Sequence, residues 1–319
     1  TTALALDHFA REAVDTAVLE VGLGGRLDAT TVGTPAVTVI ARVDLDHQAW
    51  LGGTLAEIAA EKAAIIRGGI AIAAAQAPEA AEVLVRRAGE AGVPLQLAGR
   101  ELSVTVERRG LGGQWIGCAG PGWSLRGLRL AMLGSFQPEN ALLAVAAARE
   151  LGVGDGAIRD GLDRARWPGR FQVVRSHDGW LVLDGAHNPG AARALAESLA
   201  AFFPGEPVTL VLGISRDKDA RAMLAALAPA ARRLILTAAS NPRAASPGTL
   251  LPLVPAGVTS VQTARSVEEA LAMAAEKPRT PILCGAGSLF LVGDVLRRLA
   301  GGDNPCSVEK GADSIESLF

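Results

Sequence analysis

The sequence predicts an α/β protein built from two domains. Short, continuous apolar runs of strand length alternate with helical patterns along most of the 319 residues. Runs without polar alternation suit a parallel sheet that helices cover on both faces. A chain of this length is comfortable for two domains that each bury a core. We place the boundary near a Pro-Gly pair, with domains at 1–166 and 167–300 and a polar tail at 301–319 that we expect to be disordered.

The first domain should hold a parallel sheet and its helices. Apolar runs predict strands at 16–21, 36–40 and 70–74, and helical patterns occupy the N-terminus, 55–67 and 79–91. Thr54 and Glu57 supply a capping box for the second of these helices. Pro78 suits the start of the third, where a missing N–H costs nothing.

The character of the chain then changes twice. Residues 95–133 are glycine-rich with short alternating stretches, which predicts a small antiparallel sheet, and an alanine-rich helix follows at 140–151. After Pro168-Gly169 the strand–helix alternation restarts. We expect strands at 180–183, 208–212, 233–237 and 282–284, and helices at 191–202, 220–227, 267–275 and 289–299. Such an alternation of strands and helices predicts a three-layer domain whose ligands bind at the carboxyl ends of the strands.

Composition excludes several classes of protein. The net charge of −2 leaves no electrostatic footprint for nucleic acid or an anionic membrane. No run of about 18 apolar residues is present to span a bilayer, and the charged opening is not a signal peptide. The three cysteines are far apart, which excludes a disulfide scaffold and a cysteine zinc site. We expect a cytoplasmic monomer.

Two polar residues stand at predicted strand ends in the first domain. Glu20 interrupts an apolar strand before the turn Gly22-Leu23-Gly24-Gly25, and a buried carboxylate is costly unless it pairs or binds a cation. It either caps the glycine turn or holds a cation. The turn fits a dinucleotide site poorly, because Leu27 stands where the third glycine is needed. His47 follows the next strand as a solvated loop residue or a ligand.

Lys62 lies on the apolar stripe of its predicted helix. Leu55, Ile58, Ile65 and Ile66 share that stripe at helical spacing. Its ammonium could snorkel to the surface while the stem packs in the core. Burial could instead hold the amine neutral, so that it adds carbon dioxide and becomes an anionic carbamate able to bind a metal.

Five further polar residues follow along the chain, and four of them carry comparable alternatives. Asn140 is a helix N-cap or a ligand, and Arg170 forms an interdomain salt bridge or clamps a phosphate. Asp184 ends a strand, where it caps the next helix or binds a ribose hydroxyl. His187 opens that helix, and Ser288 caps the last helix or contacts a ligand.

Several long segments resemble one known family. They are EVGLGGRLDATTV (20–32), DLDHQAWLGGTLAEIAAEKAAIIR (44–67), SFQPENALLAV (135–145), WPGRFQVV (167–174), LVLDGAHNPGAARAL (181–195) and GISRDKD (213–219). In this order, from about Thr1 to Leu299, the chain is similar to the folylpolyglutamate synthase / dihydrofolate synthase family of the Mur ligases. The motifs are long, so the resemblance is specific.

The resemblance implies a P-loop-type three-layer αβα Mur ligase central domain, N-terminally incomplete, followed by a Rossmann-like α/β C-terminal domain. It implies an ATP-dependent carboxylate–amine ligase with Mg²⁺ as cofactor and ATP as co-substrate. ATP phosphorylates a carboxylate of dihydropteroate or a folate, the amine of L-glutamate attacks the acyl phosphate, and phosphate leaves. Cations bridging the phosphates are needed for such a transfer between anions.

The resemblance also implies roles for single residues. Glu20 and His47 match magnesium ligands, and Lys62 matches the carbamylated lysine, which serves in both metal binding and catalysis. Asn140, Arg170 and Asp184 match contacts to ATP, and His187 matches a catalytic residue near the incoming glutamate.

One motif of this chemistry is absent from the sequence. No G-x-x-x-x-G-K-[ST] phosphate loop occurs in the 319 residues, and in the family that loop lies upstream of the segment where this chain begins. The first domain should then lack early strands and expose a sheet edge and apolar surface. Phe136, where histidine is common in the family, puts a minor nucleotide contact in doubt.

Three functions stay open at this point. The first is a ligase that makes dihydrofolate, extends polyglutamate tails, or does both. The second is a non-catalytic relic that binds nucleotide through its C-terminal domain. The third is a Mur-type ligase for a cell-wall precursor. Inactivity of this chain on its own is expected under the first two.

Overall fold

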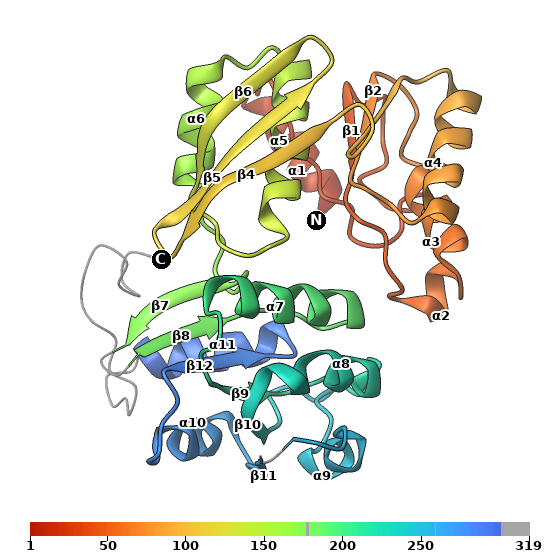
Figure 1. The fold of residues 1–319 in the computed structure, drawn as a ribbon. Coiled ribbons are helices and arrows are strands. Elements are labelled where there is room, and N and C mark those ends of the chain that lie inside the picture. The colour runs from red at the N-terminus through yellow and green to blue at the C-terminus, as the bar shows by residue number, and fades with distance from the viewer. Residues whose placement is uncertain (177–178, 259, 301–319) are drawn as a thin grey trace. The chain divides into compact units, whose positions relative to one another are not determined.

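The computed structural model describes residues 1–176, 179–258 and 260–300 and contains two parallel or mainly parallel sheets and one small hairpin sheet (Figure 1). The described chain divides into two compact units. Unit 1 holds Thr1–Val104, Cys118–Leu125 and Glu139–Ile158, and unit 2 holds Thr105–Gly117, Arg126–Pro138 and the chain from Arg159 onward. The α/β fold class is confirmed, whereas a domain boundary after residue 166 stays a prediction.

Unit 1 is built on a three-stranded parallel sheet. Its strands are β1 (Val37–Ile40), β2 (Ile70–Ala73) and β3 (Leu95–Leu97), in the order β1-β2-β3. Helices α3 (Leu55–Ala63) and α4 (Pro78–Ala91) pack against it. Their buried residues share one core with the sheet, comprising Ile58, Ala59, Ala63, Ala80, Val83, Leu84 and Ala88 from the helices and Ile40, Ala71, Ala73 and Leu97 from the strands.

Helix α5 (Gln137–Glu150) is tied to this sheet by its acidic residues. The Glu139 carboxylate accepts from the backbone N–H of Ala75, just after β2, at 2.8 Å. The Glu150 carboxylate accepts from the side-chain amide of Gln96 in β3 at 2.9 Å. The remaining helices of this half of the chain are α1 (Thr2–Arg11), α2 (Gln48–Leu51) and α6 (Asp155–Arg164).

The expected strand at 16–21 is wrong. Residues 16–21 have no strand partner, and β1 lies at the edge of the sheet as the structure describes it. A strand exists only where a neighbouring backbone completes its ladder of hydrogen bonds, so apolar composition alone does not form one. Val18 and Leu27 are 90% and 82% exposed, in agreement with the expected open edge and apolar surface.

The glycine-rich middle of the chain forms the expected small sheet. Strands β4 (Ser103–Gly110), β5 (Gly113–Gly120) and β6 (Trp123–Leu130) lie in the order β4-β5-β6. Two-residue turns, Leu111-Gly112 and Pro121-Gly122, join them. Turns this short connect only antiparallel strands, which confirms the antiparallel prediction.

Unit 2 is built on a six-stranded sheet in the order β11-β10-β9-β12-β8-β7. The strands are β7 (Gln172–Ser176), β8 (Gly179–Leu183), β9 (Val208–Leu212), β10 (Ala231–Leu236), β11 (Val261–Thr263) and β12 (Ile282–Ala286). All pairs are parallel except β7 with β8. The edge strands β7 and β11 were not expected from the sequence.

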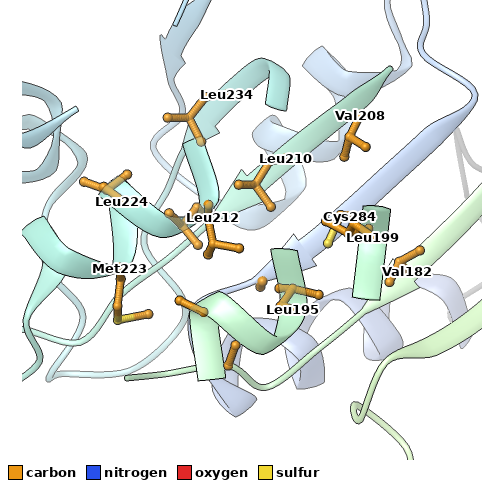
Figure 2. Close-up of a cluster of buried hydrophobic side chains, with 14 of the residues drawn as sticks. Val182, Leu195, Leu199, Val208, Leu210, Leu212, Met223, Leu224, Leu234 and Cys284 are labelled. Carbon is orange, nitrogen blue, oxygen red and sulfur yellow. The ribbon is translucent and has the colours of Figure 1, made fainter. Parts of the chain in front are cut away.

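Helices cover both faces of this sheet, which gives the expected three layers (Figure 1). Helices α7 (Pro189–Phe202) and α8 (Ala220–Leu227) share one core with β8, β9 and β10. Figure 2 shows this core, in which Leu195 and Leu199 of α7 face Leu210 of β9. Helices α10 (Val267–Ala275) and α11 (Leu289–Ala300) share the other core, and α9 (Pro247–Leu250) is a single turn.

Two expected helices have different ends. The helix expected over 55–67 stops at Ala63, because Ile66 donates to the carbonyl of Ala63 in a tighter turn and Gly69 follows with φ +59°. The helix expected from Asn140 begins three residues earlier, at Gln137. No helix of the described residues is both long enough and apolar enough to cross a membrane.

Candidate functional site

The glycine turn of unit 1 is closed by Asp28. Its carboxylate accepts from the backbone N–H of Gly22 at 3.0 Å and of Leu23 at 3.2 Å. A hydrogen bond from the Thr30 hydroxyl lowers the pKa of Asp28, and the Thr30 backbone N–H adds to that effect. Capping of the turn by Glu20 is therefore wrong. The Asp-x-Thr pattern was the available signal for Asp28, because Asp commonly binds backbone two residues ahead.

The same turn packs tightly on the end of α3. A Cβ at Gly25 would lie 2.8 Å from the carbonyl oxygen of Glu61 and 3.2 Å from that of Lys62. Arg26 donates its backbone N–H to Glu61 and forms a 2.8 Å ion pair with its side chain. Only glycine allows this approach, so the turn that follows Glu20 lies against the backbone of Lys62.

The three expected metal ligands differ in burial. Glu20 and His47 are exposed, and Lys62 is half-buried on α3. His47 has φ +51° and ψ +34°, a left-handed conformation, at the start of α2. Burial of Glu20 in a strand is thus wrong. Across residues 1–176, 179–258 and 260–300 no hydrogen bond or ion pair joins these three residues, and no three His, Cys, Asp or Glu side chains cluster as a metal site.

The donor chemistry of these residues nevertheless suits Mg²⁺. Within the described chain the Glu20 carboxylate makes no hydrogen bond or ion pair, so its oxygens are available to a hard cation. Lys62 likewise has no acidic partner there, and a carbamate on its amine would add oxygen ligands. The imidazole of His47 is the less usual ligand for this ion.

Asp184 occupies the carboxyl end of β8 in unit 2. Its backbone N–H donates to Gly285 of β12, and its side chain is 4% exposed. The carboxylate accepts from the backbone N–H of Phe171 at 2.7 Å and of Ala186 at 2.8 Å. Burial raises the pKa of Asp184 to about 6, although the two amide bonds and the charges of Arg170 and His187 act against that rise.

The turn after Asp184 leads into α7. Asn188, not Asp184, caps this helix by accepting from the N–H of Ala191 at 2.8 Å, so the capping alternative for Asp184 is wrong. His187 Nδ1 lies 2.9 Å from the carbonyl oxygen of Gly185. Ser288 caps α11 through the N–H of Leu291 at 3.1 Å, which is one of its two alternatives.

Arg170 and Asn140 lie on separate elements. Arg170 is half-buried in the turn before β7, and its charge acts on Asp184. Asn140 is exposed and is the fourth residue of α5, so it is not the N-cap of that helix. The structure therefore brings Arg170, Asp184 and His187 to one edge of the six-stranded sheet, whereas Asn140 belongs to unit 1.

The chain matches a known domain family and known proteins. Residues 169–287 match the Mur ligase, glutamate ligase domain. The chain is 34% identical to folylpolyglutamate synthase of Lacticaseibacillus casei, over 94% of its own length and 71% of that relative. It is 40% identical to a probable bifunctional folylpolyglutamate synthase/dihydropteroate synthase of Halobacterium salinarum, over 93% of its own length and 37% of that relative.

Solved structures agree with these matches. The Mycobacterium tuberculosis folylpolyglutamate synthase complexed with ADP and AMPPCP has a TM-score of 0.85 at 33% identity, over 95% of this chain and 72% of that one. Escherichia coli FolC in complex with DHPP and ADP has a TM-score of 0.83 at 32% identity, over 93% and 69%. This chain belongs to the folylpolyglutamate synthase / dihydrofolate synthase family of the Mur ligases.

Proposed function

We propose that this protein is an ATP-dependent amide ligase that adds L-glutamate to dihydropteroate, to folylpolyglutamate, or to both. The observation that carries the proposal is the carboxyl edge of the six-stranded sheet, where Arg170, Asp184 and His187 gather around the start of α7. An open α/β sheet binds its ligands at this edge. The complexes of the two similar proteins with adenine nucleotides support the same assignment.

The reaction has two transfers. A carboxylate oxygen of the pterin or folate attacks the γ-phosphorus of ATP, and ADP leaves. The amine of glutamate then attacks the acyl carbon, the amide bond forms, and phosphate leaves with the oxygen that came from the carboxylate. The ammonium of glutamate gives up its protons along the way, so a base near the amine accelerates the second transfer.

Arg170 and His187 supply the two functions needed at this edge. A guanidinium offers paired N–H donors that match phosphate oxygens. His187 Nδ1 faces a carbonyl oxygen, which only accepts, so this nitrogen carries the proton. We assign His187 the role of the base near the glutamate amine. Asp184 belongs to the same proposed nucleotide side of unit 2, and for Asn140 in unit 1 a contact with ATP stays a prediction.

Glu20, His47 and a carbamylated Lys62 are the proposed holders of Mg²⁺. Bound there, the ion would offset the negative charge of the ATP phosphates during attack by an anionic carboxylate. The role of the protein in that step would be to present anionic oxygens, and the Glu20 carboxylate, which has no partner among the described residues, could supply them.

The test is ligation by the protein expressed from its complete reading frame. MgATP, L-glutamate and either dihydropteroate or a reduced folate are supplied, and ADP and glutamylated product are measured. We expect ADP to form in step with product and only when acceptor and glutamate are both present. The acceptor that reacts decides between the two synthase activities.

Two matched arginine variants make the test specific. Arg170→Lys keeps the charge but removes the paired donors, and we expect kcat/KM for ATP to fall about tenfold or more. Arg221→Lys changes an exposed arginine on α8 and should leave the rate unchanged. Nucleotide binding without ligation of either acceptor would refute the ligase and favour a nucleotide-binding relic, and ligation of a cell-wall precursor alone would favour that third class.

A further inference from the structure

The carboxylate of Asp184 joins two turns that carry other proposed functional residues. One of its oxygens holds the N–H of Phe171, which directly follows Arg170. The other holds the N–H of Ala186, which directly precedes His187. A third bond, from the N–H of Gly185 to the carbonyl of Gly169 at 2.7 Å, ties the same two turns directly. One buried acid thus bonds to the backbone next to both functional side chains.

Phe171 shows that the first turn is held against a local preference. Its φ is +45°, a left-handed conformation that is an outlier for a bulky residue. The side chain is 1% exposed and its ring lies 5.3 Å from that of Phe202. Strain of this kind persists only where the surroundings over-determine it, and it concentrates at functional sites. The hydrogen bond from the Phe171 amide to Asp184 and the packing of the Phe171 ring hold the residue in this conformation.

We propose that Asp184 is a positioning residue whose ionised carboxylate clamps the Gly169–Phe171 turn to the Gly185–His187 turn and thereby aims Arg170 and His187. The inference rests on the proposed function and deepens it. It assigns the action of Asp184 to the backbone of two turns rather than to a direct hydrogen bond with the nucleotide.

Ionisation is what makes this clamp complete. An ionised carboxylate only accepts, so each oxygen can receive one amide N–H. A protonated carboxyl carries O–H on one oxygen, and that oxygen no longer fits a facing N–H donor. The groups that face Asp184 are Arg170 from the first turn, His187 from the second and the thiol of Cys284 on β12. Arg170 and His187 favour the ionised form, and burial opposes it.

Hydrogen exchange at single amides tests the clamp directly. In Asp184→Asn one amide faces an NH₂ donor in place of an oxygen, so we expect at least one of the Phe171 and Ala186 amides to exchange about tenfold faster or more. Asp219→Asn is the matched control, because Asp219 caps α8 at the same edge and asparagine caps equally well. Wild-type protection at both amides in Asp184→Asn would overturn the proposal.

The affinity for MgADP across pH separates positioning from a merely structural role. In the wild type, affinity should rise as pH increases through about 6, the pKa of the buried carboxyl. In Asp184→Asn it should be weaker and flat over that range. A clamp seen by exchange with an unchanged affinity profile would refute positioning. If wild type binds no MgADP, the proposed function fails, while the exchange data still judge the clamp.

Discussion

Removal of the charge at Asp184 should change how stability depends on pH. The pKa of this carboxyl is about 6 in the folded protein against 3.8 as the ordinary value. Between these two values the folded state binds more protons than the unfolded state, so stability falls as pH rises through that window. From about pH 5 to about pH 8 the loss from this one group is about 1.4 kcal/mol.

The Asp184→Asn variant lacks this ionisation and should not show the loss. In the variant, one backbone amide faces a donor, which lowers the free energy of unfolding by about 1–3 kcal/mol at every pH. This constant loss competes with the pH-dependent loss in wild type, so either protein can be the more stable one at a given pH. What is fixed is the change with pH: relative to wild type, the variant should gain about 1.4 kcal/mol between the two pH values.

Urea titrations of wild type, Asp184→Asn and Asp219→Asn at both pH values measure this difference. Effects of the other titrating groups cancel between proteins. Asp219 is exposed, so its variant should keep a constant offset. An Asp184→Asn stability that stays constant relative to wild type, or that falls relative to wild type as pH rises, would refute the idea of a carboxylate held ionised against the cost of burial.

Other predictions follow from single contacts. Gly287→Ala should destabilise unit 2 by about 2 kcal/mol or more, because Gly287 has φ +106° and a Cβ would lie 2.5 Å from a backbone oxygen. Gly293→Ala, with open space on α11, is the control and should be neutral or stabilising. Thermal unfolding of both variants distinguishes them. Thr54→Ala should cost about 1 kcal/mol in urea titrations, since it removes the capping box of α3, and an unchanged midpoint would show that the cap contributes nothing. Glu20→Ala should abolish magnesium-dependent ligation while circular dichroism and melting temperature stay unchanged, and wild-type rates would remove Glu20 from the metal site. Lys62→Ala should lose ligation and regain part of it with added acetate, and full unassisted activity would exclude a carbamate.

Continuous apolar runs were a reliable guide to the six-stranded sheet, because β9, α8 and α10 lie where the runs and caps predict them. The two helices bury their apolar faces against the sheet that contains β9, so pattern and packing agree. The run at 16–21 failed because a strand also needs a partner, and sequence pattern does not contain the partner.

Local hydrogen bonding was the weakest point of sequence reasoning at the candidate site. The sequence predicts Asp184 at a strand end, but its bond to Phe171 joins a turn 13 residues away along the chain, which the local pattern does not contain. Asp28 was missed although its own Asp-x-Thr pattern signals a turn. The roles of Glu20, His47 and Lys62 come from resemblance, and their assembly around a metal stays a prediction.

The fate of the acceptor's carboxylate oxygen tests the proposed reaction most directly. The acceptor is prepared with a heavy oxygen isotope in its carboxylate and incubated with the complete protein, MgATP and L-glutamate. An acyl phosphate route transfers one labelled oxygen to inorganic phosphate for every amide bond formed, and this is the result we predict. Ligation that leaves the phosphate unlabelled, or no ligation with either pterin acceptor, would contradict the account.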